Sequence, residues 1–399
     1  MLEVNISTLG ILLFVAMLTS IAADKLRVPY SVGLVAAGVA LALGPISVNF
    51  PLSKNVVFLV FLPPLVFEAA LNIRWPALRR DLPVVVTLAF AGVAVSAGVV
   101  AAGMHFIIGW SWVGATLFGS LIAATDPVSV IALFKETRVS DRLHLLVESE
   151  SLLNDGVAAV LFAVALQYAS GEALTAPGIA VEIARSVAGG VAAGGIVAGA
   201  LLFVAGRTTD KLVEITLTTL AAYGSFLLAE YFHLSGVLAS LTAGLVVGNV
   251  GSRGTITEAN RIGVWAFWEY AAFLANSLIF VLIGGHSAGL PLIPIWKPAL
   301  VASLIILVAR AVAIYPLSAL FARSALRIDP RHQHVLVWGG LRGALALALA
   351  LGLPVDLPQR GAIVLTAFAV VAISIFGQGL TMPLLLRALG LVVRDPPAA

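Results

Sequence analysis

The sequence contains no cysteine and has few charged residues. Zero Cys among 399 residues excludes disulfide bridges, thiolate metal sites and cysteine nucleophiles. Charged residues make up 11% of the chain, whereas soluble domains carry about 25%. Hydrophobic residues make up 60%, and the mean hydropathy is +1.07. This composition leaves no room for a large soluble domain, so the chain is predicted to be an all-α polytopic membrane protein in contact with the lipid bilayer.

Residues typical of enzyme sites are also scarce. Five of the six histidines fall near the ends of apolar runs, namely His105, His144, His286, His332 and His334. No His pair has metal-ligand spacing, and no Gly-x-Ser-x-Gly sequence is present. The net charge of +3 is spread through loops. We therefore expect no enzyme activity, no cofactor and no nucleic-acid partner.

Apolar runs bounded by charged residues, Pro or Gly predict about thirteen transmembrane helices. Their expected limits are 7–23, 30–45, 55–73, 82–104, 112–134, 146–169, 178–205, 213–231, 235–250, 263–286, 297–322, 332–352 and 360–388. The runs 30–45 and 235–250 are short and Gly-rich, which suits tilted or partly buried helices.

The basic residues are distributed unevenly between alternate loops. If the N-terminus is outside, 17 of the 23 Lys and Arg residues lie in cytosolic loops or at the C-terminal end. Three lie in outer loops (Lys54, Lys297, Arg360) and three within spans (Arg185, Arg310, Arg342). The positive-inside rule then predicts a multi-pass protein of the cell (inner) membrane, with its N-terminus outside and its C-terminus cytoplasmic.

Two of the predicted spans carry a helix-breaking sequence. Pro127 in the span 112–134 removes a backbone hydrogen bond, and three glycines weaken the span 332–352. A single Pro could be an ordinary kink, but each break also contains a charged residue. The residues of the two breaks are Thr125, Asp126 and Pro127, and then Gly339, Gly340, Arg342 and Gly343.

The two breaks lie seven spans apart, so they traverse the membrane in opposite directions. This spacing predicts two inverted repeats of six helices, about 7–169 and about 213–388, joined by a linker helix at about 178–205. Each repeat has a broken helix at its fifth position, spans 5 and 12, and the two broken helices would cross. Broken helices at matching positions of two halves indicate a transporter site.

The stretch Glu148–Val157 brings acids into the apolar span 146–169. Asp155 lies about ten residues from the cytosolic end, roughly 15 Å or half of the hydrocarbon core. Ser151 shares a helix face with Asp155, and Glu150 and Asn154 form a second stripe. An acid at this depth is costly and usually functional. With oxygen ligands beside it, Asp155 could hold a small cation or a proton, although it could also only tie helices together.

Several charges of the predicted spans fall at similar depth. Arginine stays protonated in proteins, so each buried arginine is expected to neutralise one acid permanently. One or two acids then remain to exchange ligands. Thr125 and Asp126 could offer main-chain and side-chain oxygen, whereas Glu68 could also be a packing acid. The charges of this layer are Glu68, Asp126, Glu150, Asp155, Arg310 and Arg342.

A site that takes either Na⁺ or H⁺, and that faces each side of the membrane in turn, is an antiporter. A cation channel would need a continuous pore with a repeated filter, and only one asymmetric cluster is present. A sensor without transport stays open as an alternative. Li⁺ and K⁺ stay open as substrates, so K⁺/H⁺ exchange is the second hypothesis.

Four segments resemble signature segments of the monovalent cation:proton antiporter family, in its sodium/proton exchanger branch. They are Pro63-Pro64 with Glu68, Thr125-Asp126-Pro127, Glu150-Ser151 with Asn154-Asp155, and Gly340 to Gly343. The resemblance covers nearly the whole chain. It implies thirteen helices, a homodimer with separate core and dimer domains, and an elevator movement of the core that exchanges Na⁺ or Li⁺ for H⁺ in pH and sodium homeostasis.

The resemblance also implies roles for individual residues. It makes Asp155 the ion-binding acid, with Ser151, Glu68 and the Thr125 main chain as further Na⁺ contacts. Asn154 stands where the charge-moving branch has a second Asp, which implies electroneutral 1:1 exchange. The structural pairs it implies are Glu150 with Arg310, and Asp126 with Arg342. A long cytosolic regulatory tail is not expected after Arg394.

Overall fold

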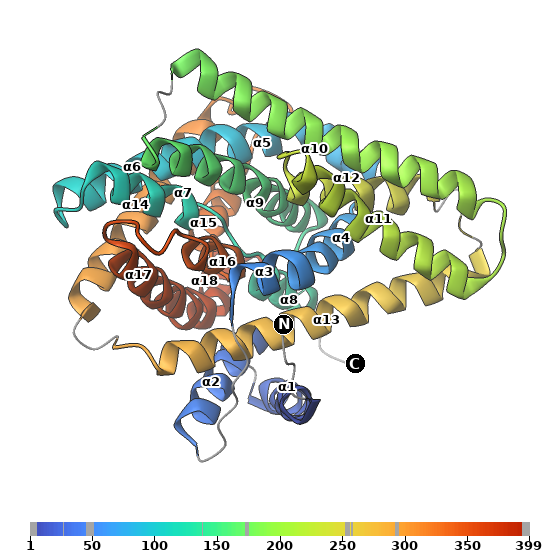
Figure 1. Ribbon diagram of the computed structural model, residues 1–399, viewed down its shortest axis with the longest axis horizontal. Helices are drawn as coiled ribbons and strands as arrows, with labels where there is room; N and C mark the ends of the chain where they lie inside the picture. The colour runs from blue at the N-terminus through green and yellow to red at the C-terminus, as the bar shows by residue number, and fades with distance from the viewer. Residues whose placement is uncertain are drawn as a thin grey trace.

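The structure is a computed structural model that describes residues 6–26, 28–44, 52–137, 139–171, 175–251, 256, 258–291 and 295–392. Regular structure in these ranges is entirely helical (Figure 1). The α-helices are α1 (Ile6–Leu26), α2 (Tyr30–Leu43), α3 (Lys54–Val56), α4 (Leu62–Asn72), α5 (Trp75–Thr87), α6 (Val93–Phe106), α7 (Trp112–Ile122), α8 (Val128–Thr137), α9 (Asp141–Ala169), α10 (Ala176–Ala205), α11 (Lys211–Tyr231), α12 (Gly236–Asn249), α13 (Glu258–Ala288), α14 (Trp296–Ala319), α15 (Pro330–Trp338), α16 (Ala344–Leu351), α17 (Arg360–Ile373) and α18 (Leu380–Ala388).

Three α-helical segments continue into others through short π-helical stretches. These stretches are Val57–Phe61 between α3 and α4, Leu88–Gly92 between α5 and α6, and Ser374–Gly379 between α17 and α18. Across the described residues, nine helical stretches are long and apolar enough to cross a membrane, and α2, α7 and α12 are shorter apolar helices. The prediction of an all-helical, multi-span membrane protein is confirmed.

The helices pack into two groups. The frame helices are α1–α4 and α10–α13, in which α13 packs along α2, and α12 packs against α4 and α10. The broken-helix group comprises α5–α9 and α14–α18, in which α6 packs on α7 and α14. In Figure 1, α10 to α12 lie on the right and the helices around α7, α14 and α17 on the left, with α9 between them.

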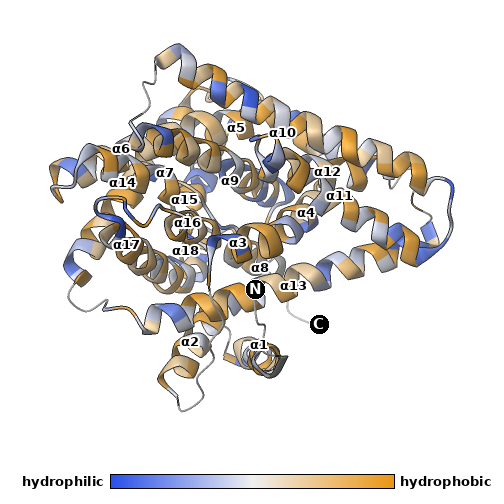
Figure 2. Cartoon of the chain, viewed as in Figure 1, coloured by the Kyte–Doolittle hydropathy of each residue, from blue (hydrophilic) through white to orange (hydrophobic). Residues whose placement is uncertain are grey.

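Helix α9 connects the two groups. It packs against α5 and α7 of the broken-helix group and also touches α10 and α12 of the frame helices. Figure 2 shows hydrophobic residues along the outer helices and hydrophilic residues gathered around α9 at the centre. The polar part of the membrane-spanning region therefore lies at the boundary between the groups.

Glycines allow the frame helices to approach each other closely. A Cβ atom at Gly284 of α13 would overlap the main-chain carbonyl of Val35 on α2, and one at Gly38 would overlap that of Val281. Small residues allow such backbone contact between membrane helices, where no hydrophobic effect drives them together. The α2–α13 crossing is therefore fixed by main-chain atoms that cannot move aside.

Both predicted helix breaks are present in the structure. Helix α7 ends at Ile122 and α8 begins at Val128, directly after Pro127. Helix α15 ends at Trp338 and α16 begins at Ala344. Two non-helical segments, 123–127 and 339–343, thus interrupt the membrane-spanning region.

The close crossing of α2 and α13 generates a prediction about stability. Gly284→Ala places a methyl group against main-chain atoms, and overpacking of this kind costs about 1–3 kcal/mol. We expect a lower melting temperature of the purified protein in detergent. The matched control is Gly199→Ala on α10, because no atom lies within 4 Å of a Cβ there. Equal melting temperatures for the two variants would show that the crossing is not tightly packed.

Candidate cation site

Helix α9 carries most of the candidate site. Its N-terminus is capped by Ser140, whose hydroxyl accepts a hydrogen bond from the Leu143 main-chain N–H at 3.4 Å, and Asp141 lies in the first turn, where an acid is favourable. No Pro interrupts its 29 residues. The helix is therefore continuous beside the first break, and its residues Ser151, Asn154 and Asp155 lie next to that break.

Side chains of α9 bind the first break through a chain of hydrogen bonds. The Asn154 amide donates to Thr125 Oγ1 at 3.1 Å and to Glu150 Oε1 at 3.4 Å. The Thr125 hydroxyl donates to Ser151 Oγ at 3.2 Å. All four side chains are buried. Thr125 is thus held by its own side chain at the point where α7 has ended.

Two buried oxygens of this cluster have no hydrogen-bond donor. Asp155 Oδ1 and Asn154 Oδ1 are both inaccessible and without a partner in the structure. The Asn154 amide nitrogen is already occupied by Thr125 and Glu150, which fixes its oxygen as a free acceptor. Because buried polar atoms in proteins are almost always satisfied, each of these oxygens is a candidate acceptor for a cation, and the carboxylate also for a proton.

The two helix breaks bind each other. Arg342 Nη1 donates to the carbonyl oxygens of Ala123 and Ala124 at 2.8 and 2.9 Å. In return, the Asp126 main-chain N–H donates to the carbonyl of Leu341 at 2.8 Å. A helix that ends inside the membrane leaves carbonyl and N–H groups without partners. Each break supplies some of the groups that the other lacks.

Two of the three predicted break glycines lie against charged side chains from other segments. A Cβ atom at Gly343 would overlap the Asp126 carboxyl group, and one at Gly340 would lie 2.7 Å from Nε of Arg310. Gly339 directly follows α15 as its C-cap. The glycines therefore do more than weaken a helix, because they let charged groups of other helices reach the second break.

The expected ion pair between Glu150 and Arg310 is present. Arg310 Nη1 lies 2.8 Å from Glu150 Oε1, and both side chains are at most 4% exposed. Arg310 Nη2 also donates to the carbonyl of Leu336 at 2.8 Å. The pair connects α9 to α14 and α15, and charge-assisted bonds of this kind are strong when both partners are buried.

The expected ion pair between Asp126 and Arg342 is not found among the described residues. Asp126 Oδ1 instead accepts a hydrogen bond from the Val128 main-chain N–H at 2.9 Å, which caps the N-terminus of α8. The guanidinium of Arg342 is directed to the carbonyls of Ala123 and Ala124. Both side chains therefore bind main-chain groups that a helix end leaves without partners inside the membrane.

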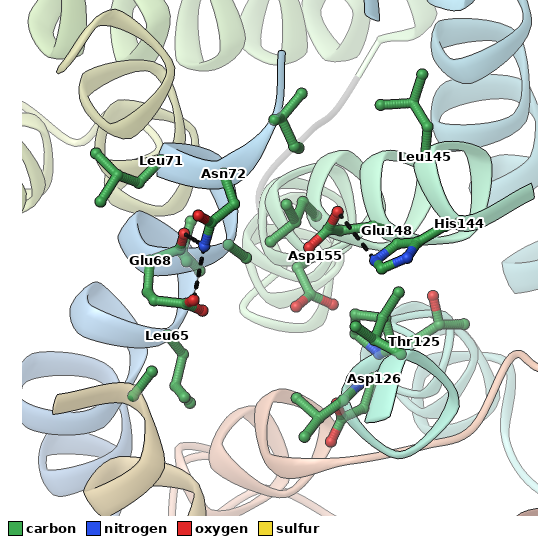
Figure 3. A pocket seen from close by; sticks show the side chains of 18 of the residues that line it. Leu65, Glu68, Leu71, Asn72, Thr125, Asp126, His144, Leu145, Glu148 and Asp155 are labelled. Carbon is green, nitrogen blue, oxygen red and sulfur yellow. Dashed lines mark hydrogen bonds and ion pairs between the residues drawn. The ribbon is translucent and has the colours of Figure 1, made fainter. Parts of the chain in front are cut away.

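A cavity of about 910 Å³ reaches Asp155 between the two helix groups. Figure 3 shows the carboxyl groups of Glu68, Asp126 and Asp155 around it, with Glu68 on α4 opposite α9. Ser151, Asn154 and Glu150 are not among the lining residues. The cavity also meets three basic residues, Arg74, Arg80 and Arg142.

Two features near the cavity were given no role in the site from the sequence. Asn72 donates to Glu68 Oε1 at 2.7 Å and so orients this carboxyl group. His144 and Glu148, 3.7 Å apart, both line the cavity. Asn72 lies four residues after Glu68, and Glu148 seven before Asp155. Helical spacing on one face was therefore the signal that could have found both.

The chain was compared with known families, curated proteins and solved structures. Residues 10–388 match the profile of the family described as "Sodium/hydrogen exchanger, transmembrane". The chain is 38% identical over 394 residues to the Na(+)/H(+) antiporter ApNhaP of Aphanothece halophytica, covering 98% of this chain and 75% of that protein. It is 35% identical to the Na(+)/H(+) antiporter NhaP of Pseudomonas aeruginosa over 340 residues, covering 82% of this chain and 79% of that protein.

A solved structure has the same fold. The sodium proton antiporter MjNhaP1 from Methanocaldococcus jannaschii at pH 8 aligns with a TM-score of 0.78. The alignment covers 96% of this chain and 98% of that chain, at 20% sequence identity. At this identity, the likeness is informative about the arrangement of helices.

The buried ion pair generates a prediction about stability. Arg310→Ala leaves Glu150 buried and unpaired, and breaking a buried pair costs roughly 3–5 kcal/mol. We expect a large drop in melting temperature in detergent, with little change in the apparent constant for Na⁺ in the protein that remains folded. The control is Arg185→Ala, which removes an exposed pair with Glu182 at 3.7 Å and should change little. A normal melting temperature together with a shifted constant would place Arg310 in the cation site instead.

Proposed function

Since the chain belongs to the sodium/hydrogen exchanger family, we propose that it exchanges Na⁺ for H⁺ across a membrane, with Asp155 as the group that binds either ion. The family match over residues 10–388 and the antiporters among its relatives support the reaction. The observation that carries the site is the Asp155 carboxyl group, which lines a cavity and has one buried oxygen, Oδ1, without a hydrogen-bond donor. The protein is a transporter rather than an enzyme.

Exchange follows from competition at one carboxylate. A sodium ion at Asp155 would use the free oxygens of Asp155 and Asn154, with the hydroxyl oxygens of Thr125 and Ser151 nearby. Glu68 faces the same cavity and would attract the cation on its way in. A proton on Asp155 removes the charge that holds Na⁺. The two ions therefore cannot occupy the carboxylate together, and each drives the other off.

Transport further requires that the site face each side of the membrane in turn. We propose that the broken-helix group moves against the frame helices in an elevator movement. The α2–α13 crossing rests on main-chain contact, whereas at the group boundary the three atoms nearest to a Cβ at Gly156 of α9 all belong to the side chain of Leu238 on α12. Contacts through a flexible side chain permit sliding more readily than main-chain contacts. This difference supports a rigid frame and a mobile group.

The charges along the cavity support a proposed state and orientation of the protein. Arg74, Arg80 and Arg142 line it, and the positive-inside rule assigns these residues to the cytosolic side. The cavity would then open to the cytosol. The proposed topology has thirteen spans, with the N-terminus outside and the C-terminus cytoplasmic, in two inverted repeats at about 7–169 and 213–388 around a linker helix at about 178–205. We further propose that the protein is a homodimer.

The number of exchangeable charges supports 1:1 exchange. Glu150 is neutralised by Arg310, and Asn154 carries no proton that it could release. If Asp155 alone exchanges ions, the form with Na⁺ bound and the form with H⁺ bound carry the same net charge. One cycle then moves no charge across the membrane.

The first prediction of this proposal concerns Asp155. Asp155→Asn should abolish cation-driven proton movement, because an amide cannot take up and release a proton. The measurement is fluorescence dequenching in proteoliposomes on addition of Na⁺, Li⁺ and K⁺ in turn, which also separates Na⁺/H⁺ from K⁺/H⁺ exchange. Ser149→Ala is the control, because its hydroxyl is buried on the same helix but has no partner, and it should exchange normally. If Asp155→Asn retained cation-driven proton movement, Asp155 would not be the group that binds the exchanged ions.

The second prediction concerns voltage. Electroneutral exchange should proceed at the same rate, within experimental error, whether or not a potential is imposed with valinomycin and K⁺. Two exchangeable protons per Na⁺ would instead move one net charge, worth about 2.3 kcal/mol per 100 mV, and the rate would change steeply. Such a change would mean that Glu68 or Asp126 also carries a proton through the cycle.

A further inference from the structure

One short segment from another part of the chain forms hydrogen bonds with the main chain of the second helix break. The π-helical stretch Ser374–Gly379 lies between α17 and α18. The Ser374 hydroxyl accepts a hydrogen bond from the Arg342 main-chain N–H at 3.0 Å and donates to Gln378 Oε1 at 2.7 Å. The Gln378 amide nitrogen donates to the carbonyl of Trp338 at 3.0 Å. The same two side chains thus bind the main chain on both sides of Gly339 and Gly340.

The polar side chains of this segment supply the hydrogen-bond partners that the main chain of the break lacks. The break frees the carbonyl of Trp338 and the N–H of Arg342 from helical hydrogen bonds, and both would be costly without partners. Gln378 uses its oxygen and its nitrogen, and Ser374 acts as acceptor and donor at once. Departures from α-helical geometry such as a π-helical stretch occur frequently at functional sites.

This network continues to the cation site through Arg342. Its main chain is fixed by Ser374, and its guanidinium holds the carbonyls of Ala123 and Ala124. Thr125 follows directly in the chain, and its hydroxyl connects Asn154 to Ser151. A displacement of Arg342 would therefore move Thr125 and the oxygens that surround Asp155.

We propose that Ser374 and Gln378 are positioning residues for the cation site. They do not touch the ion. They set the place of Arg342, and through it the spacing between the oxygens of Thr125, Asn154 and Asp155, which determines how well cations of different radius are held. The proposal rests on the proposed exchange of Na⁺ for H⁺ and adds residues that tune affinity and the discrimination between Na⁺ and Li⁺.

Ser374 and Gln378 could instead serve only to stabilise the packing of α15 beside the end of the chain's last helices. Thr381 offers a matched control for such a purely structural role. Thr381 Oγ1 accepts a hydrogen bond from Trp338 Nε1 at 3.0 Å. This bond joins Trp338 of α15 to the first turn of α18, directly after the π-helical stretch, but does not extend to the main chain of Arg342. Thr381→Val therefore removes a hydrogen bond of the same length, 3.0 Å, and leaves the hydrogen bonds of Ser374 and Gln378 in place.

The experiment compares four variants in proteoliposomes: Ser374→Ala, Ser374→Thr, Gln378→Leu and Thr381→Val. Apparent constants for Na⁺ and Li⁺ and the maximal rate are measured for each, with the melting temperature in detergent. Residues that orient ligands without contacting the ion typically change affinity about 10-fold or more. We expect Ser374→Ala and Gln378→Leu to raise the Na⁺ constant about 10-fold and to change the ratio of the Na⁺ and Li⁺ constants.

Ser374→Thr keeps a hydroxyl and should stay close to the parent protein, as should Thr381→Val. Parent-like constants and ratio in Ser374→Ala and Gln378→Leu would overturn the proposal, and so would an equal shift in Thr381→Val. If Gln378→Leu does not fold, Gln378→Glu is measured instead, because it keeps the acceptor for Ser374 and loses the donor to Trp338. It should give a smaller shift in the same direction, and an unchanged Na⁺/Li⁺ ratio would overturn the proposal.

The parent protein is assayed first, and this separates the two proposals. If neither Na⁺ nor Li⁺ drives proton movement in the parent, the proposed function has failed, and the positioning role falls with it. If the parent exchanges and the variants do not differ from it, only the positioning role has failed.

Discussion

A charge held away from water must be balanced, and this requirement organises the centre of the molecule. Glu150 is balanced by Arg310 in a buried ion pair, and Arg342 is surrounded by main-chain carbonyls of the opposite break. Asp155 has only partial support, because one of its oxygens has no donor at all. Two of these charges are permanently compensated by the protein, and that of Asp155 is left to a cation or a proton. The fold around α9 can be understood as the scaffold that maintains this difference.

The broken helices make that difference possible, because a continuous helix would offer no free polar groups beside Asp155. Helix ends placed in the membrane would normally be unstable. Here they are tolerated because the two breaks share donors and acceptors, and because Ser374 and Gln378 serve the groups that remain. The site therefore depends on helices from both halves of the sequence, although most of the residues proposed to meet the ion lie on α9.

Much of the fold could be predicted from the sequence, and the reason is physical. A membrane requires long apolar helices, so each predicted span overlaps helical structure in the described residues, and Pro127 and the glycines near Arg342 marked the breaks. The pairing of Glu150 with Arg310 could be anticipated because both charges lie deep and need a partner. The direction of Arg342 could not, because depth gives no information about which acceptor a side chain faces. The role proposed for Gln378 could not be predicted either, because it depends on a contact with Trp338, 40 residues away in the sequence.

The reciprocal bonding of the two breaks also has a consequence for biosynthesis. The carbonyl of Ala124 and the guanidinium that holds it are 218 residues apart in the chain. At typical synthesis rates of about 5–20 residues per second, α7 and α8 are complete on the order of 10–40 s before their partner leaves the ribosome. During that interval the first break has unsatisfied carbonyls that lipid cannot satisfy. We therefore expect the first break to stay in contact with water or with the insertion machinery during that interval. It would take its final position in the membrane once α15 and α16 have been synthesised.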